Sequence, residues 1–261
     1  MKYWFLIRAY VKYQIRALTA HGVHSPFVYN FIKEVLEDKR SFYAFDEIAS
    51  LRKKLVADNS TLEVQDFGAG SHTTSSSTRS IQDIAKHAGR TAKYGRLLFR
   101  MVNYFKSKSI LELGTSLGLG TSYLAKANEH AKVISIEGSA HIARQAAANF
   151  DSLGIKNIEQ LVGNFDEVLP SLLQKKKFDF IFFDGNHREE ATINYFNWAL
   201  PYADHQSVFV FDDIHWTQGM ENAWNSIRTH EAVTCSIDLF YFGIVFFNPE
   251  IKEKQHFVLR Y

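Results

Sequence analysis

Carboxylates follow two short apolar runs of the sequence, in positions where they could act together. Asp184 comes directly after the run at 178–183, and Asp212 and Asp213 come after the run at 208–211. If these runs are neighbouring parallel strands, they lie roughly 4.8 Å apart and end at the same sheet edge. Three carboxylates gathered there would repel one another unless a hard divalent cation such as Mg²⁺ bound them. We therefore predict a metal site at Asp184, Asp212 and Asp213. The alternative is that these residues cap a loop and a helix or contact a cofactor.

His187 lies three residues after Asp184. Imidazole titrates near neutral pH, so a histidine at this position can accept the proton of a hydroxyl group. We predict that His187 is a catalytic base beside Asp184. His215 is a second candidate for acid–base chemistry or metal binding, although a histidine followed by Trp216 is more typical of packing.

A glycine-rich segment after another apolar run has the features of a cofactor-binding turn. Glycines allow a tight turn that approaches a ligand closely, and the free amides of the following helix face polar groups. Glu137 ends the next apolar run, where a carboxylate can accept hydrogen bonds from ribose hydroxyls. A third run is followed by polar side chains and a ring that could flank an adenine. The predicted cofactor-binding residues are Glu112, Gly114, Thr115, Ser116, Gly118, Glu137, Asn164, Phe165 and Asp166, together with Asp184.

A second glycine-containing segment competes with this assignment. Residues 66–71 (DFGAGS) also follow a short apolar run, but a Ser/Thr-rich tract comes next, at 71–80. No second strand with an acidic end follows them. We interpret 66–71 as a structural or substrate-side turn, and 71–80 as an exposed loop.

Apolar runs alternate with helical patterns from residue 91 onward. The predicted strands are 109–113, 133–137, 158–162, 178–183 and 208–211. Apolar strands that alternate with helices are typical of an α/β fold with a parallel sheet covered on both faces, whose function concentrates at the carboxyl ends of the strands. Segments 233–238 and 243–247 predict an antiparallel hairpin that closes the sheet. Residues 1–90 show mainly helical patterns.

Composition limits the class of protein. Of 261 residues, 46% are hydrophobic and 22% charged, which excludes a disordered chain, and the net charge of +2 argues against a nucleic-acid binder. The single cysteine, Cys235, cannot form an intramolecular disulfide, so we expect the reducing cytoplasm. No secretion signal or transmembrane segment is predicted, since Asp238 interrupts the long apolar stretch at 232–249.

The first predicted helix, within residues 3–18, carries a row of basic residues. Arg8, Lys12 and Arg16 are spaced four apart, beside an apolar row. We favour a solvated helix face. The alternative is peripheral contact with an anionic surface such as lipid headgroups.

The segments that follow the predicted strands resemble class I S-adenosylmethionine (SAM)-dependent methyltransferases, among them catechol-, caffeoyl-CoA- and macrolide-sugar-type O-methyltransferases. The resemblance extends from about residue 91 to residue 247. It is carried by 110–118 (ILELGTSLG), Glu137, 163–170 (GNFDEVLP) and 178–187 (FDFIFFDGNH). It implies a Rossmann-like, seven-stranded, mostly parallel sheet with an antiparallel last strand. It also implies that 91–261 form the SAM-binding domain, and we expect 1–90 to form a helical cap on the substrate side.

The resemblance also implies roles for individual residues. In these families 114–118 would lie under the methionine part of SAM, Glu137 would hold the ribose and 164–166 would flank the adenine. Metal-dependent members have an aspartate where Asp184 stands and an Asp-Asn or Asp-Asp pair at 212–213. Macrolide-sugar members have a histidine where His187 stands. We therefore expect methyl transfer to a hydroxyl of a small molecule, assisted by Mg²⁺.

Two other functions are compatible with the same residues. One is metal-independent methyl transfer to nitrogen or oxygen, and the other is SAM binding by an interaction protein without turnover. The presence of Asp184, His187, Asp212 and Asp213 together favours an enzyme. A homodimer is compatible with the sequence, which does not define the acceptor.

Overall fold

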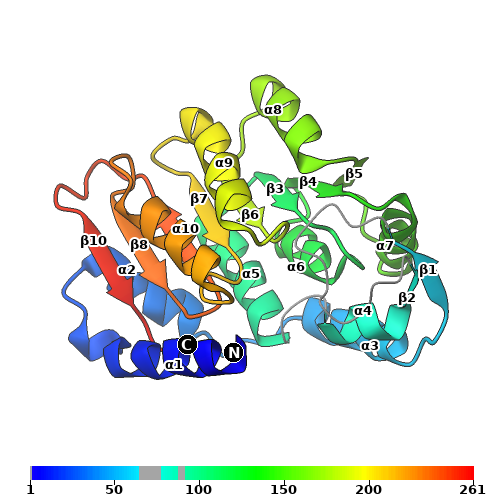
Figure 1. Ribbon diagram of the computed structural model, residues 1–261, viewed down its shortest axis with the longest axis horizontal. Coiled ribbons are helices and arrows are strands. Elements are labelled where there is room, and N and C mark those ends of the chain that lie inside the picture. Colours follow the sequence, from blue (N-terminus) through cyan, green and yellow to red (C-terminus); the bar gives the residue numbers. More distant parts are fainter. Residues whose placement is uncertain (1, 65–77, 88–91) are drawn as a thin grey trace. The chain divides into compact units, whose positions relative to one another are not determined.

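The computed structural model describes residues 2–64, 78–87 and 92–261, and its helices and strands are labelled in Figure 1. The chain forms two compact units, one made of Met1–Leu36 with Leu172–Tyr261 and the other of Glu37–Ser171. Each unit is α/β, because its helices flank parallel strands. The predicted turn at 66–71 lies outside the described residues.

The unit formed by Glu37–Ser171 contains three parallel strands joined by helices. The strands are β3 (Ser109–Leu113), β4 (Lys132–Glu137) and β5 (Ile158–Val162), in that spatial order. The helices are α3 (Tyr43–Val56), α4 (Ile81–His87), α5 (Ala92–Phe105), α6 (Leu119–Ala127), α7 (Ala140–Ser152) and the start of α8 (Phe165–Lys175). A short antiparallel pair, β1 (Thr61–Glu63) and β2 (Thr78–Ser80), completes it.

One side of α5 is apolar and buried, which explains why this segment is helical. Leu97, Leu98, Met101 and Val102 are all buried and recur at a helical spacing. Phe45 of α3 lies in a core cluster with Phe99 of α5, with Leu117 of the glycine-rich turn and with Tyr123 of α6. Helix α3, which lies within residues 1–90, thus shares a hydrophobic core with α5 and α6, the helices that flank strand β3 along the chain.

The other unit contains five strands, in the order β10-β8-β9-β7-β6. They are β6 (Phe180–Phe183), β7 (Val208–Phe211), β8 (Cys235–Asp238), β9 (Gly243–Phe246) and β10 (Gln255–Val258). Its helices are α1 (Lys2–Arg16), α2 (Pro26–Phe31), α9 (Glu189–Ala199) and α10 (Gln218–Thr229), and short helical turns span Ala20–Gly22, Ile32–Leu36 and Leu200–Tyr202. Every residue of β6 and β7 is buried, as expected for parallel strands covered on both faces.

The strand order is β10-β8-β9-β7-β6 in one unit and β3-β4-β5 in the other, which confirms the predicted mostly parallel fold. The predicted count of seven strands was one too low. β9 is antiparallel to both β7 and β8, as the predicted hairpin required, but it is not the last strand. β10 follows it and pairs in parallel with β8. The sequence QHFV of β10 is short and half exposed, so it lacks the apolar signal of the other strands.

Helix α1 is held against the end of β10. The backbone of Leu18 bridges Leu259, and the hydroxyl of Tyr13 donates to the carbonyl of Leu259 at 2.5 Å. Ala9, Tyr13 and Phe240 form a small buried cluster at this contact. Among the described helices, none is both long and apolar enough to cross a bilayer. The assignment of 1–90 as a substrate-side cap and of 91–261 as the cofactor-binding region stays a prediction.

Candidate active site

The glycine-rich turn after β3 depends on left-handed backbone. Gly114 has φ 105° and Gly118 has φ 79°, a region that favours glycine. A Cβ atom on Gly118 would overlap the ring of Phe150. The turn is fixed by hydrogen bonds from Gly114 N to Ile136 O at 2.9 Å and from Gly118 N to Thr115 O at 2.9 Å. Helix α6 begins immediately after it, so its first amides border the turn.

The carboxylate of Glu137 is hydrogen-bonded to this turn. Its Oε2 accepts from the backbone N–H of Ser116 at 2.8 Å, and its Oε1 accepts from the N–H of Ser139 at 3.0 Å. Ser116 has φ 49°, a left-handed conformation in which its backbone N–H points to the carboxylate of Glu137. The structure thus brings together Glu137 at the end of β4 and the turn after β3, which the sequence predicted as parts of one cofactor site.

Glu112 differs from the other carboxylates among the predicted cofactor-binding residues, Glu137, Asp166 and Asp184, because it is buried. Its Oε2 accepts hydrogen bonds from Ser135 Oγ at 2.6 Å and from Thr121 Oγ1. Thr115 Oγ1 lies 2.6 Å from Ser135 Oγ, so hydroxyls connect the turn to the buried carboxylate. Burial raises the pKa of Glu112 to about 7, although the two hydroxyl donors act in the opposite direction. Ser135 and Thr121 were not predicted as partners of Glu112. The features in the sequence that could have indicated them are a serine within an apolar strand and a threonine near the start of a helix.

The segment after β5 meets the end of β4. Gly163 N donates to Glu137 O at 3.0 Å. The carbonyl of Asn164 accepts from Val168 N at 3.0 Å, and its Oδ1 accepts from Asp166 N at 3.1 Å, so Asn164 caps α8. Phe165 is half-buried and Asp166 is exposed in the first turn of that helix. The contact of Gly163 places the start of this segment beside Glu137, and the binding of an adenine by 164–166 stays a prediction.

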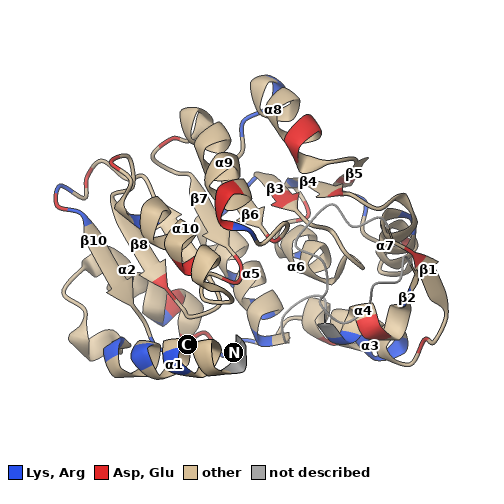
Figure 2. Cartoon of the chain, viewed as in Figure 1, with Lys and Arg blue, Asp and Glu red and all other residues tan. Residues whose placement is uncertain are grey.

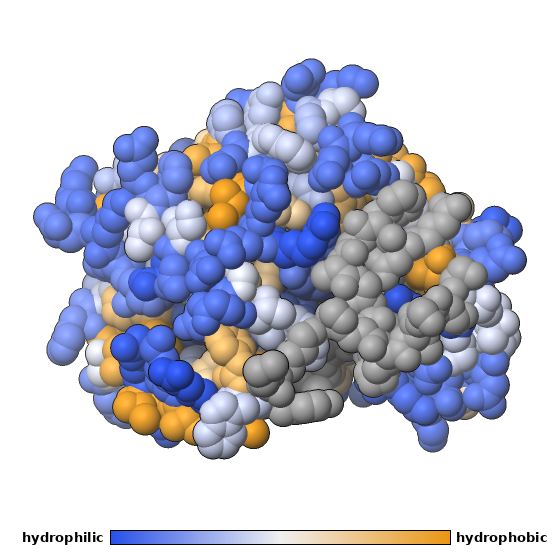
Figure 3. All heavy atoms as spheres, in the orientation of Figure 1, coloured by the Kyte–Doolittle hydropathy of each residue, from blue (hydrophilic) through white to orange (hydrophobic). Residues whose placement is uncertain are grey.

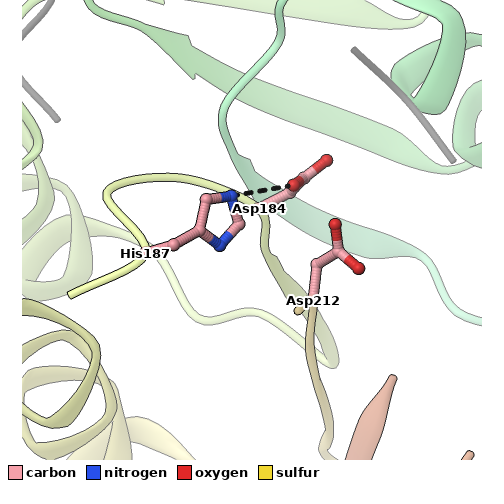
Figure 4. A group of neighbouring side chains, drawn as sticks. All are labelled: Asp184, His187 and Asp212. Atoms are coloured by element: carbon pink, nitrogen blue, oxygen red, sulfur yellow. Dashed lines mark ion pairs between the residues drawn. The ribbon is translucent and has the colours of Figure 1, made fainter. Parts of the chain in front are cut away.

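A second group of polar side chains lies at the carboxyl ends of β6 and β7. Asp184, His187 and Asp212 each offer a ligand atom, and these atoms lie within 4.8 Å of one another (Figure 4). His187 Nε2 is 3.6 Å from Asp184 Oδ1. Asp212 N donates to Phe183 O at 3.0 Å, a contact that fixes the end of β7 beside the end of β6. Asp212 is buried, whereas Asp184 and His187 are half-buried.

Asp213 is not a member of this group, which among the described residues contains His187 in its place. Asp213 has φ 59°, so the chain leaves the extended conformation immediately after Asp212. The metal-binding role of Asp213 stays a prediction.

His215 pairs with a residue that the sequence reasoning missed. Its Nε2 lies 2.8 Å from Asp238 Oδ2, and its ring stacks on Phe240 with 5.5 Å between centroids. Asp238 also accepts from Phe240 N at 2.8 Å. The signal for Asp238 is a single carboxylate at the end of an apolar strand. The pairing gives His215 a structural partner, in agreement with the packing interpretation.

Comparison with known proteins finds similarity to methyltransferases. A family model described as a methyltransferase domain matches residues 111–214. The catechol O-methyltransferase of Mycobacterium tuberculosis is 29% identical over 126 residues, which are 48% of this chain and 56% of that protein. The chain therefore aligns with little more than half the length of this relative.

Two solved structures have the same fold. The O-methyltransferase TomG from Streptomyces achromogenes, involved in tomaymycin synthesis and solved in complex with SAM, aligns with a TM-score of 0.57 and 20% identity, over 80% of this chain and 91% of TomG. An O-methyltransferase from Bacillus cereus, solved with S-adenosylhomocysteine (SAH), aligns with a TM-score of 0.55 and 19% identity, over 84% of this chain and 97% of that one.

The fold is that of class I SAM-dependent methyltransferases, and residues 111–214 match the model of a methyltransferase domain. This confirms the resemblance seen in the sequence. Within the class, the proteins similar to this chain are O-methyltransferases.

Proposed function

We propose that this protein transfers a methyl group from SAM to a hydroxyl oxygen of a small molecule, with a divalent cation at Asp184 and Asp212 and with His187 as the base. The observation that carries the proposal is the approach of these three side chains to within 4.8 Å at the ends of two neighbouring strands. The similarity to catechol O-methyltransferase supports a hydroxyl acceptor.

The residues of the glycine turn would bind the cofactor. Glu137 already holds two backbone N–H groups with its two oxygens, so its carboxylate is fixed in direction before a ribose arrives. At Gly114 and Gly118 the turn would present only backbone to the cofactor, because glycine has no side chain. When bound, SAM supplies an electrophilic methyl group on a sulfonium, whose positive charge disappears during the transfer.

The donor set fits a divalent cation. Two carboxylates and one imidazole offer ligand atoms within 4.8 Å of one another, and Mg²⁺ is commonly held by one or two carboxylates plus waters. The buried carboxylate of Asp212 lies close to a second carboxylate, and such a pair favours a bound cation. A cation bound there would supply Lewis-acid polarisation of the acceptor oxygen.

His187 would accept the proton that the acceptor hydroxyl loses. Its Nε2 lies 3.6 Å from Asp184 Oδ1, and the negative charge of that carboxylate stabilises the imidazolium once the proton has been taken. Asp184 would thus hold the cation and also position His187. The proton leaves the site when the imidazolium exchanges with solvent, which its half-buried position allows.

The first experiment measures turnover with isotope-labelled SAM and a panel of catechols, hydroxylated aromatics and sugars. We expect methyl transfer to at least one catechol or sugar hydroxyl. We also expect loss of activity in EDTA and its recovery when Mg²⁺ is added. Full activity in EDTA would support metal-independent transfer. SAH binding without turnover on any acceptor would support a binding protein.

Replacement of His187 tests its role as the base. We expect His187→Ala to lower kcat about 100-fold or more, the usual contribution of a general base, and to leave SAH affinity unchanged. The matched control is His205→Ala, which removes an exposed imidazole from the same unit. Equal losses of kcat and SAH affinity in His187→Ala would mean that this residue is structural.

Replacement of Asp212 tests the cation site separately. Asp212→Asn keeps the shape of the side chain and removes its charge, so we expect the Mg²⁺ concentration needed for half-maximal activity to rise about tenfold or more. SAH affinity, measured by calorimetry without metal, should not change. An unaltered Mg²⁺ requirement would exclude Asp212 as a ligand.

A further inference from the structure

Helix α1 presents a row of large apolar side chains to solvent. It packs against its own unit through Ala9 and Tyr13, which are buried with Phe240. The opposite side of the helix, by the period of 3.6 residues per turn, is exposed. Trp4 is 75% exposed and Ile15 is 80% exposed. This row, which we call the α1 outer face, consists of Trp4, Ile7, Val11, Ile15 and, just past the helix end, Leu18.

The α1 outer face is continuous enough to be an interaction surface. Its members recur every three or four positions and so form one stripe along the helix. Figure 3 shows hydrophobic residues gathered over α1 beside hydrophilic ones. Single exposed apolar residues are ordinary, but a contiguous row of this kind on a described surface marks a contact site.

Basic residues flank the α1 outer face along one side. Arg8, Lys12 and Arg16 are exposed and spaced one helical turn apart, and Figure 2 shows Lys and Arg along α1. Lys12 pairs with Glu221 at 3.4 Å, an exposed contact that contributes little. The first 33 residues contain five of the chain's 30 basic residues and none of its 28 acidic ones. Positive charge is therefore concentrated in this part of the chain, although the whole chain is nearly neutral.

We propose that the α1 outer face binds the surface of an anionic lipid bilayer. A helix with apolar side chains on one face and lysine or arginine beside them lies in the interface plane, with its apolar side chains among the headgroups. Cations next to that face attract anionic headgroups, and an exposed tryptophan prefers the same interface. Arg8, Lys12 and Arg16 provide the first feature and Trp4 provides the second.

The geometry of α1 makes this contact peripheral. The helix has 15 residues, too few to span a hydrocarbon core, which needs about 20. Its inner side is tied to the protein by the hydrogen bond from Tyr13 to Leu259 and by the cluster around Phe240. The whole unit would therefore sit on the bilayer with α1 along its surface.

Charge disfavours a second copy of this chain as the occupant. Two α1 outer faces packed together would bring two rows of arginine and lysine close to each other. Like charges at such a distance repel, and the described part of α1 offers no acidic residue to compensate. An anionic lipid surface complements both the apolar row and the basic row.

Vesicle sedimentation tests the proposal with the full chain. We expect binding to vesicles of phosphatidylcholine with phosphatidylglycerol and much weaker binding to phosphatidylcholine alone. The triple variant Arg8→Gln, Lys12→Gln, Arg16→Gln should bind the anionic vesicles about 100-fold more weakly, since each cation near such a surface contributes about fivefold. The matched control, Lys53→Gln, Lys54→Gln, Lys132→Gln, removes the same charge from exposed positions elsewhere and should bind like the wild type.

A second pair of variants tests the apolar row. Trp4→Ser should weaken vesicle binding at least about tenfold, whereas Tyr43→Ser, at a position 92% exposed outside α1, should not change it. Sedimentation velocity without lipid tests the competing possibility that the α1 outer face binds a second copy of the chain. Absence of binding to anionic vesicles would overturn the proposal. So would equal losses in both charge variants, or a dimer that Trp4→Ser dissociates.

Discussion

Replacing Glu112 by glutamine should change how the stability of this protein depends on pH. Glu112 is 1% exposed and lies beneath the glycine turn, where Ser135 and Thr121 donate to its carboxylate. Burial is the largest influence and raises its pKa from 4.5 to about 7, with a smaller contribution from the charge of Glu137. Glutamine keeps the shape and an oxygen acceptor but cannot ionise.

The sign follows from the two states of the chain. Below pH 4.5 the carboxyl group is protonated both in the folded and in the unfolded protein, so it favours neither. Between pH 4.5 and about 7 the unfolded chain releases the proton while the folded protein keeps it, and the free energy of unfolding falls as pH rises. Above about pH 7 both states are ionised and the loss is complete. A shift of this size corresponds to about 3 kcal/mol.

The histidine His256 produces the opposite slope in the same range. Burial lowers the pKa of His256 from 6.5 to about 4, so the unfolded chain binds a proton that the folded protein refuses. The free energy of unfolding then falls as pH decreases from 6.5 towards 4. The pH profile of the wild type alone combines both effects, and the contribution of Glu112 appears only in the difference between the wild type and the variant.

The assay is urea unfolding of the wild type, Glu112→Gln and the control Glu129→Gln, each between about pH 5 and about pH 8. Glu129 is exposed, so its variant should follow the wild type. We expect Glu112→Gln to gain stability relative to the wild type as pH rises, by up to about 3 kcal/mol. If the free energies of unfolding of Glu112→Gln and the wild type differ by the same amount at every pH in this range, Glu112 does not titrate with a raised pKa.

Two further replacements test the glycine-rich turn and the carboxylate beside it. Glu137→Ala should raise the SAH dissociation constant about tenfold or more, because hydrogen bonds to a charged group contribute about 1.5–3 kcal/mol; calorimetry measures it, and an unchanged constant would place the ribose elsewhere. Gly118→Ala should lower the free energy of unfolding in urea by more than Gly154→Ala does. Both positions have a left-handed φ, but only at Gly118 does the added Cβ meet a neighbour, the ring of Phe150, and such overpacking costs about 1–3 kcal/mol. Equal losses in the two variants would show that the ring moves aside.

The strands and the polar residues that follow their carboxyl ends were predictable because their signals are local. The four buried residues of β6 and of β7 are continuous apolar runs, and Asp184 and Asp212 follow directly. The rule that parallel strands end at one edge then brought them together. His187 joined the same group because only a short loop separates it from Asp184.

Other features depend on contacts between distant residues and carry no local signal. The sequence places Glu112 beside the cofactor turn, but its burial depends on Thr121 and on Ser135, which is 23 positions away. Asp238 reaches His215 across the same separation of 23 positions. β10 is recognisable only by its pairing with β8, since its own residues are half exposed.

The hydrogen bond from Tyr13 to Leu259 joins residues 246 positions apart. A contact that closes so large a loop forms late, because the loss of chain entropy precedes any gain from the contact. On a ribosome that adds about 5–20 residues per second, α1 emerges roughly 10–50 s before its anchor has been made. A nascent chain would display Trp4 and Ile15 throughout that interval, together with the Ala9 and Tyr13 side that is later covered. Chaperones, or a nearby membrane, would therefore meet this helix while both of its apolar sides are open.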